Sequence, residues 1–388
     1  MSVWLLPENI ADILPRETRA IEKLRQDFLN LVISHGFEQI RPPLIEYVDS
    51  LLTGTGGDLD LKTFKTVDQA SGRLLGVRAD MTPQIARIDA HILNRTGITR
   101  LCYAGSVLHA RPLHPMASRE PYVAGVELFG SRSPESDREV ISLGVQALHI
   151  FGISSVHVDF GHTGVVHSIF AQDPLTKAYE DSILFALSHK DTCALEELRG
   201  KIADKSVDAF RKVAMTFGGE SALNELESYF ADSEEALRAI AEVRSLAAGC
   251  GADEVSFDFG DVHGYRYLTG VTFSVTIPQR FQAILRGGRY DDIGAKFGRN
   301  RPAVGFTIYL REIASMMDTR RPYAVLAPGG TGDAALEHKI KELRGAGRIV
   351  VTKLPEDTIE SLEEAFRLDE ELKLENGVWV LKDRTETI

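Results

Sequence analysis

The sequence predicts an α+β protein in which a mostly antiparallel sheet is flanked by helices. Strand-like apolar runs recur around polar connections, and between residues 171 and 248 they give way to helical segments rich in Ala, Leu and Glu. A β-α-β alternation follows Pro322, as in small α/β domains. Since 388 residues exceed one typical domain, we predict a core over residues 1–320, with a helical insertion at 171–248, and a second, small C-terminal α/β domain over 321–388.

The first predicted element is an amphipathic helix over residues 16–35, which Gly36 would end. Its apolar positions recur at steps of three and four residues: Ile21, Leu24, Phe28 and Leu31. The next segment, residues 36–47, predicts a short strand followed by a bend, because Pro42-Pro43 cannot donate hydrogen bonds to a central ladder.

Residues 74–88 predict a strand that leads into a helix, with Thr82 as the capping residue and Pro83 at the first helical position. Residues 100–112 and 120–130 predict two strands of an antiparallel hairpin that are joined by a long polar connection.

Further core strands are predicted on both sides of the helical insertion. They cover residues 154–164, 254–260, 265–277 and 281–293. Inside the insertion, residues 231–246 predict a helix that opens with Asp232 and Glu235 as a capping pair. The C-terminal domain is predicted to contain strands at 323–328, 348–355 and 377–383 and a turn and helix at 329–344.

The composition excludes several classes of protein. Lys and Arg number 44 against 56 Asp and Glu, which gives a formal net charge of −12 and disfavours non-specific binding to nucleic acid. No apolar stretch approaches the roughly 20 residues that cross a bilayer, and the N-terminal segment does not resemble a signal peptide. The three cysteines form no CxxC pattern. We therefore expect a cytoplasmic protein with neither a membrane nor a nucleic-acid partner.

No metal or cofactor site is predicted. His157, His162 and His167 recur every five residues, a spacing that neither a helix nor a strand brings onto one face. The glycine turn at residues 328–333 lacks the lysine and hydroxyl of a phosphate-binding loop.

Polar residues inside otherwise apolar runs indicate a small-molecule site. Glu127, for example, would be costly to bury without a partner. A sheet surface with carboxylates, tyrosines and arginines suits a zwitterionic ligand, although solvated strand faces would give the same pattern. The set comprises Arg78, Asp80, Thr82, Arg111, Arg119, Glu127, Tyr265, Arg266, Tyr267, Arg289 and Tyr290.

Several segments resemble the class II aminoacyl-tRNA synthetases. Residues 36–47 (GFEQIRPPLIEY) resemble motif 1, residues 101–130 motif 2 and residues 287–312 motif 3. The best match is the histidyl-tRNA synthetase core. HGYRYLTG (263–270) resembles the histidine signature of that core, and GGRYD (287–291) matches another segment of the core residue for residue. The resemblance spans residues 4–315 and implies a class II synthetase-like antiparallel sheet flanked by helices.

The arginines with which such a synthetase would bind ATP are replaced. Arginine stays protonated and binds phosphate oxygens in a fork, but the three corresponding positions carry His109, His263 and Glu312. Each lost contact of this kind typically costs about 10²–10³ in rate. We therefore predict no catalytic residue. The alternative is an active histidyl-tRNA synthetase in which Arg111 and Arg266 act as surrogate cations.

The amino-acid pocket resembles that of the synthetase more closely. The resemblance assigns five residues to a histidine pocket: Asp80, Thr82, Glu127, Tyr267 and Tyr290. Two positions depart from the pattern, since Val123 replaces a glutamine and Leu268 replaces a tyrosine.

Together with RADMTPQIARI (78–88) and LCYAGSVL (101–108), this combination resembles the family of ATP phosphoribosyltransferase regulatory subunits, which are non-catalytic relatives of histidyl-tRNA synthetase. The resemblance implies a subunit that short-form catalytic ATP phosphoribosyltransferase requires for the first step of histidine biosynthesis, with histidine as a feedback effector. It further implies a self-dimer through the motif 1 surface and a hetero-octamer with the catalytic subunit. A free-standing amino-acid-binding or nucleic-acid module is a third hypothesis.

Overall fold

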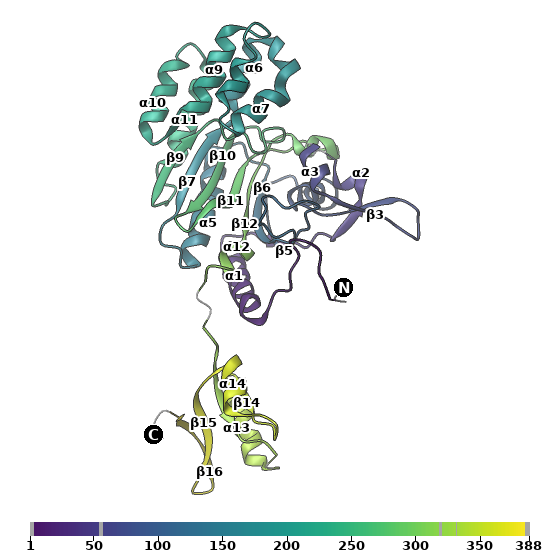
Figure 1. Cartoon of the computed structure of the whole chain (residues 1–388), viewed down its shortest axis with the longest axis vertical. Helices are drawn as coiled ribbons and strands as arrows, with labels where there is room; N and C mark the ends of the chain where they lie inside the picture. The colour runs from purple at the N-terminus through teal and green to yellow at the C-terminus, as the bar shows by residue number, and fades with distance from the viewer. Residues whose placement is uncertain (1–3, 54–56, 318–319, 331, 385–388) are drawn as a thin grey trace. The chain divides into compact units, whose positions relative to one another are not determined.

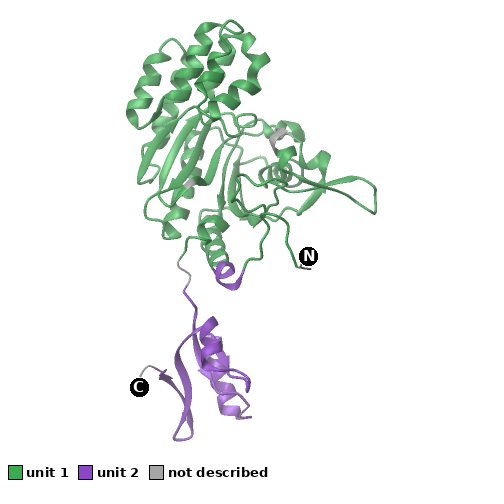
Figure 2. Ribbon diagram, in the orientation of Figure 1, with its two compact units in different colours: residues 1–13, 20–317 green, residues 14–19, 318–388 purple. Residues whose placement is uncertain are grey.

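The computed structural model describes residues 4–53, 57–317, 320–330 and 332–384. The chain divides into two compact units (Figure 2): residues 1–13 and 20–317 form the first, and residues 14–19 and 318–388 form the second. Among the described residues, no helix combines the length and the apolar character that crossing a membrane requires.

A nine-stranded sheet forms the centre of the first unit, in the order β1-β5-β6-β12-β11-β10-β7-β9-β8 (Figure 1). Its strands are β1 (Glu38–Gln39), β5 (Thr99–Ser106), β6 (Tyr122–Phe129), β12 (Ala303–Tyr309), β11 (Arg280–Arg289), β10 (Val271–Ile277), β7 (His157–His162), β9 (Glu254–Asp258) and β8 (Phe217–Gly218). The β1–β5 and β7–β9 pairs are parallel and the other neighbours are antiparallel. The predicted hairpin of residues 100–112 and 120–130 is confirmed as β5 and β6.

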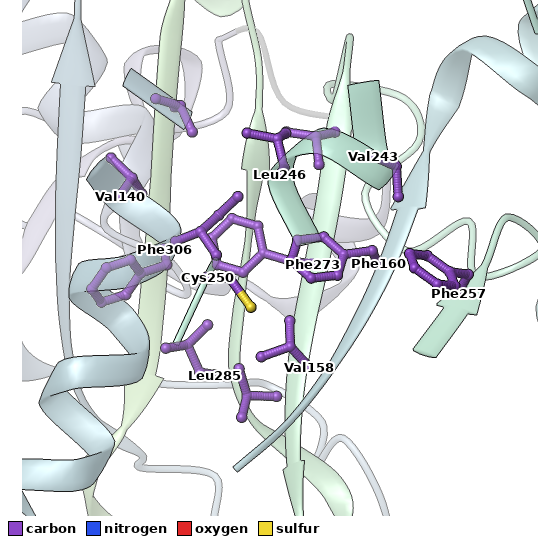
Figure 3. Packing of buried hydrophobic residues seen from close by; sticks show 14 of the residues in the cluster. Val140, Val158, Phe160, Val243, Leu246, Cys250, Phe257, Phe273, Leu285 and Phe306 are labelled. Carbon is purple, nitrogen blue, oxygen red and sulfur yellow. The ribbon is translucent and has the colours of Figure 1, made fainter. Parts of the chain in front are cut away.

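One face of this sheet carries the main hydrophobic core. Phe160 of β7, Phe273 of β10 and Phe306 of β12 are buried there, beside Val140 of α5 (Pro134–Ile150) and Val243 of α11 (Glu234–Ala247), as Figure 3 shows. Burying one such phenylalanine contributes about 1.5–3 kcal/mol. Since side chains alternate along a strand, the neighbours of each phenylalanine along its own strand point to the opposite face.

The predicted N-terminal amphipathic helix is confirmed as α1 (Pro15–Ser34). Its Phe28 ring meets the Phe306 ring edge-on, with 6.3 Å between the centroids. A separate three-stranded sheet follows in the order β2-β4-β3. The elements of this region are β2 (Ile45–Tyr47), α2 (Val48–Leu51), α3 (Gly57–Lys62), β3 (Phe64–Val67), β4 (Leu74–Val77), α4 (Thr82–Arg87) and the π-helical turn η1 (Ile88–Leu93).

Helices occupy most of the chain between β7 and β9. They are α6 (Thr163–Gln172), η2 (Pro174–Tyr179), α7 (Glu180–Ser188), α8 (Thr192–Glu196), α9 (Asp204–Met215), α10 (Glu220–Tyr229) and α11. The predicted capping pair of α11 is wrong. Ser233 precedes the helix, and its hydroxyl oxygen accepts a hydrogen bond of 3.4 Å from the Ala236 amide.

The strand predicted over residues 265–277 begins only at Val271. Gly264 has a φ of +74°, and its carbonyl accepts the amide of Leu268 at 2.9 Å, so the chain turns before it enters β10. Two short helices flank β12: η3 (Ile293–Phe297) and α12 (Leu310–Ala314).

The second unit contains a four-stranded sheet in the order β14-β13-β15-β16. Its elements after residue 320 are β13 (Tyr323–Ala327), α13 (Ala334–Gly345), β14 (Val350–Thr352), α14 (Ile359–Ala365), β15 (Arg367–Glu375) and β16 (Val378–Asp383). The strand β13 is parallel to β14 and β15, while β15 and β16 are antiparallel. The sequence did not predict β15, because charged residues separate its leucines.

Candidate functional site

A cavity of about 550 Å³ opens on the polar face of the nine-stranded sheet. Its lining includes Gly305 and Thr307 of β12 and Arg286 and Gly288 of β11, which alternate with core residues along the same strands. The two glycines place no side chain above the sheet, and the Glu127 carboxyl group lies in the space above Gly305.

All five residues that the sequence assigned to a ligand pocket line this cavity: Asp80, Thr82, Glu127, Tyr267 and Tyr290. They come from β6, from the region around the start of α4, from the turn before β10 and from the end of β11. Segments that are distant in the sequence therefore meet at one site.

Glu127 is the centre of a buried hydrogen-bond network. Its carboxyl group accepts a hydrogen bond of 2.8 Å from the Thr82 hydroxyl and one of 3.3 Å from the Tyr103 hydroxyl. The Tyr290 hydroxyl donates to the second oxygen. Burial raises the pKa of Glu127 to about 8, although the hydroxyl groups of Tyr290 and Thr82 oppose this shift. A cationic ligand group would find here a carboxyl that is already oriented.

Tyr103 and Thr307 belong to the same network, but the sequence analysis did not assign them to it. Tyr103 is fully buried on β5, and its hydroxyl shares a hydrogen bond of 2.7 Å with the Thr307 hydroxyl. The pairing of the strands brings Tyr103 and Thr307 together, since Gly125 of β6 pairs with Tyr103 of β5 on one side and with Thr307 of β12 on the other.

Thr82 does not cap its helix, so that prediction is wrong. The residue before α4 is Met81, and Thr82 is the first helical residue. Its hydroxyl donates to Glu127, while its amide donates to the Asp80 carboxylate at 3.1 Å. This turn fixes both Asp80 and Thr82 at the edge of the cavity.

Tyr267 lies at a more open position than Tyr290. Tyr267 is 39% exposed and Tyr290 is 2% exposed. A β-carbon added at Gly264 would lie 2.9 Å from the Tyr267 hydroxyl, so the ring folds back over that glycine. Tyr267 is thus at the rim of the cavity and Tyr290 at its buried end.

Other members of the predicted polar set have structural roles. Arg289 forms a buried ion pair of 2.9 Å with Asp137. Arg78 donates to the carbonyl groups of Ser106 and Pro42 at 2.9 Å each, and Arg119 donates to the His109 carbonyl at 3.1 Å. These arginines hold loops and strands together around the site.

The positions where a synthetase would bind ATP offer no guanidinium group. His109 is buried, its Nε2 atom lies 3.1 Å from the Ala79 carbonyl, and burial lowers its pKa. His263 is bonded to Asp261, and Glu312 is paired with Arg280. Of the two surrogate arginines, Arg266 lines the cavity but is paired with Asp181, and the described lining does not include Arg111.

The cavity lining is acidic. Its carboxylates are Asp80, Glu127, Asp159, Asp181, Asp258 and Asp261. Its arginines and lysine are Lys62, Arg266 and Arg286. Such a surface attracts a positively charged ligand group and repels a polyphosphate.

Two family models match the chain. Residues 9–313 match the model described as histidyl-tRNA synthetase, and residues 321–382 match the model described as the ATP phosphoribosyltransferase subunit HisZ C-terminal domain.

Two relatives that are similar along the whole chain are both named ATP phosphoribosyltransferase regulatory subunit. One from Ralstonia nicotianae is 44% identical over 384 residues, with 99% of each chain covered. Another from Burkholderia lata is 45% identical over 385 residues, covering 99% of this chain and all of the relative.

Solved structures support the same fold. A crystal structure from Bacillus halodurans, described as an ATP phosphoribosyltransferase regulatory subunit/histidyl-tRNA synthetase, has a TM-score of 0.82 and 26% identity, and covers 95% of this chain and 97% of that one. Histidyl-tRNA synthetase from Nostoc has a TM-score of 0.76 at 18% identity, covering 98% of this chain and 94% of that one, and shows the fold alone. The predicted class II synthetase-like fold is confirmed.

Proposed function

Because the chain belongs to the ATP phosphoribosyltransferase regulatory subunit family, we propose that it activates the short-form catalytic ATP phosphoribosyltransferase and transmits histidine feedback to it. It is a regulatory subunit and not a catalytic one. One observation supports the sensing role above all others. A buried carboxyl with three hydroxyl donors lies in the cavity, and the three positions that resemble the ATP-binding arginines of a synthetase carry His109, His263 and Glu312.

Histidine has the chemistry that this cavity suits. Its cationic groups would be received by Glu127 and Asp80, and Tyr267 and Tyr290 would supply hydroxyl groups and ring faces. The acidic lining disfavours the triphosphate of ATP. The pocket therefore fits amino-acid binding better than adenylate formation.

Regulation requires that ligand binding change the partner's equilibrium between active and inactive states. Such coupling is typically about 1–3 kcal/mol between sites. We propose that histidine binds one state of the assembled complex more tightly, which shifts the complex toward inhibition.

The same proposal covers assembly. The motif 1 segment, residues 36–47, carries the exposed side chains of Leu44 and Ile45, which suit a self-dimer contact. We propose that dimers of this chain join catalytic subunits in a cytoplasmic hetero-octamer. Light-scattering mass measurement of the mixed proteins tests the stoichiometry.

Calorimetric titration of histidine into the full chain tests the pocket. Glu127→Gln keeps the shape of the side chain but cannot ionise when a cationic ligand group binds, so we expect binding about 10-fold or more weaker. Glu254→Gln is the matched control, because Glu254 is exposed on β9. Equal affinities for the wild-type and Glu127→Gln chains would place the histidine site elsewhere.

A further inference from the structure

An amino-acid ligand brings a carboxylate into an acidic cavity, and this carboxylate requires a cation. Three lining residues carry a permanent or near-permanent positive charge: Lys62, Arg266 and Arg286. Arg266 is 47% exposed and closely paired with Asp181 of α7. Arg286 is 39% exposed and is paired with Asp261 across a longer distance of 3.4 Å. The looser pair leaves Arg286, together with Lys62, as a candidate for the ligand's carboxylate.

Arg286 rises from the floor of the cavity itself. On β11 it pairs with Thr307 of β12, the residue whose hydroxyl bonds to Tyr103 in the Glu127 network. Lys62 instead is the last residue of the short helix α3, outside the nine-stranded sheet. A guanidinium on the floor is thus in the same polar surface as the buried carboxyl.

The donors of Arg286 are largely available. Within the described part of the chain, its side-chain hydrogen bond is a long one of 3.4 Å from Nη1 to Asp261. Asp261 is itself held by the His263 ring and by the His263 amide at 3.2 Å. Since a guanidinium has five N–H donors, Arg286 can bind a carboxylate in a bidentate manner while Asp261 holds it in place.

The spacing suits a single amino acid. Glu127 pairs with Gly305, Gly305 pairs with Gly288, and Arg286 lies two residues from Gly288 on β11. Two strand spacings and two residues along a strand separate the Cα atoms of Glu127 and Arg286 by about 12 Å. Both side chains line the cavity, so a ligand there can reach both.

We propose that Arg286 binds the α-carboxylate of the ligand and makes the cavity select an amino acid over the corresponding amine. This inference rests on the proposed histidine-binding function. Arg286 would be a specificity-determining residue at the opposite end of the ligand from Glu127.

Titration calorimetry with histidine and with histamine, which lacks the carboxylate, tests this assignment on the full chain. The wild-type chain should prefer histidine by about 10–100-fold, the effect of a charge-assisted bidentate contact. Arg286→Gln should lose most of this preference by weakening histidine while leaving histamine binding unchanged. Retained histamine binding also reports that the variant cavity is folded.

Two further variants make the result specific. Arg286→Lys should recover part of the preference, because it restores the charge without the fork. Lys62→Gln should keep the wild-type preference. An unchanged preference in Arg286→Gln, or its loss in Lys62→Gln alone, would overturn the assignment. Absence of histidine binding to the wild-type chain would instead contradict the proposed function, and this inference with it.

Discussion

Gly305 lies directly beside the carboxyl group of Glu127: a β-carbon at position 305 would be 1.8 Å from Glu127 Oε2. The two residues are register partners on β12 and β6. The same β-carbon would lie 2.5 Å from the Val126 carbonyl oxygen. The buried carboxyl and its hydrogen bonds therefore depend on the absence of a side chain on the neighbouring strand.

Gly305→Ala should displace Glu127 and disrupt the network. We expect a loss of about 1–3 kcal/mol in unfolding free energy, as for other overpacked sites, together with loss of histidine binding. Thermal unfolding and calorimetry measure the two effects. Gly345→Ala is the control, since a β-carbon there meets nothing within 4 Å. Wild-type binding by Gly305→Ala would show that the position of Glu127 does not matter.

The raised pKa of Glu127 predicts a pH-dependent stability for the ligand-free chain. Below pH 4.5, the carboxyl is protonated in both folded and unfolded states. Between pH 4.5 and about 8 the folded state keeps this proton and the unfolded state loses it. Stability therefore falls as pH rises, by up to about 1.4 kcal/mol per pH unit from this group.

Glu127→Gln removes this contribution, so the variant should gain stability relative to wild type as pH rises from 5 to 8. Urea unfolding at several pH values measures the difference, and Glu234→Gln, at an exposed position of α11, should run parallel to wild type. A constant difference between Glu127→Gln and wild type over this range would mean that Glu127 is ionised in the folded chain.

Arg289 should matter for stability rather than for recognition. Burial raises the pKa of its partner Asp137 to about 6, and Arg289 opposes that shift. Arg289→Met leaves this carboxyl buried and unpaired, which should cost about 3–5 kcal/mol. The urea concentration at the midpoint of unfolding measures this loss of stability. The control is Arg238→Met, at an exposed position of α11. An unchanged midpoint for Arg289→Met would contradict a structural role.

Restoring a motif 2 arginine should not restore synthetase chemistry. His109 is buried and bonded to the Ala79 carbonyl, so His109→Arg forces a larger, charged group into a packed position. We expect a loss of about 1–3 kcal/mol or more and no histidine-dependent ATP–pyrophosphate exchange. His338→Arg, at an exposed position, should be stable. Exchange activity in His109→Arg would mean that one cation suffices to revive catalysis.

Local sequence pattern predicted two kinds of element. The helix α1 was predicted from apolar positions at steps of three and four residues, and the β5–β6 hairpin from two apolar runs around a polar connection. The strand β15 was missed, since its leucines are interspersed with charged residues that a sequence pattern reads as solvated. The start of β10 was predicted too early. Gly264 turns the chain with a positive φ, but the tyrosines that follow it are typical of a strand.

The site was predicted in part, and the missing part depends on register. Glu127 stood out as a carboxylate inside an apolar strand. Tyr103 and Thr307 did not, because each becomes a neighbour of Glu127 only through strand pairing. The cap assigned to Thr82 was wrong for a related reason: its hydroxyl bonds to a residue 45 positions away rather than to its own helix.

The account is tested most directly by reconstitution. The purified full chain is titrated into a short-form catalytic ATP phosphoribosyltransferase supplied with ATP and phosphoribosyl pyrophosphate, and the initial rate is followed with and without histidine. We predict that the rate rises to saturation with the added chain and falls as histidine is added. A rate that is independent of the chain would contradict the account.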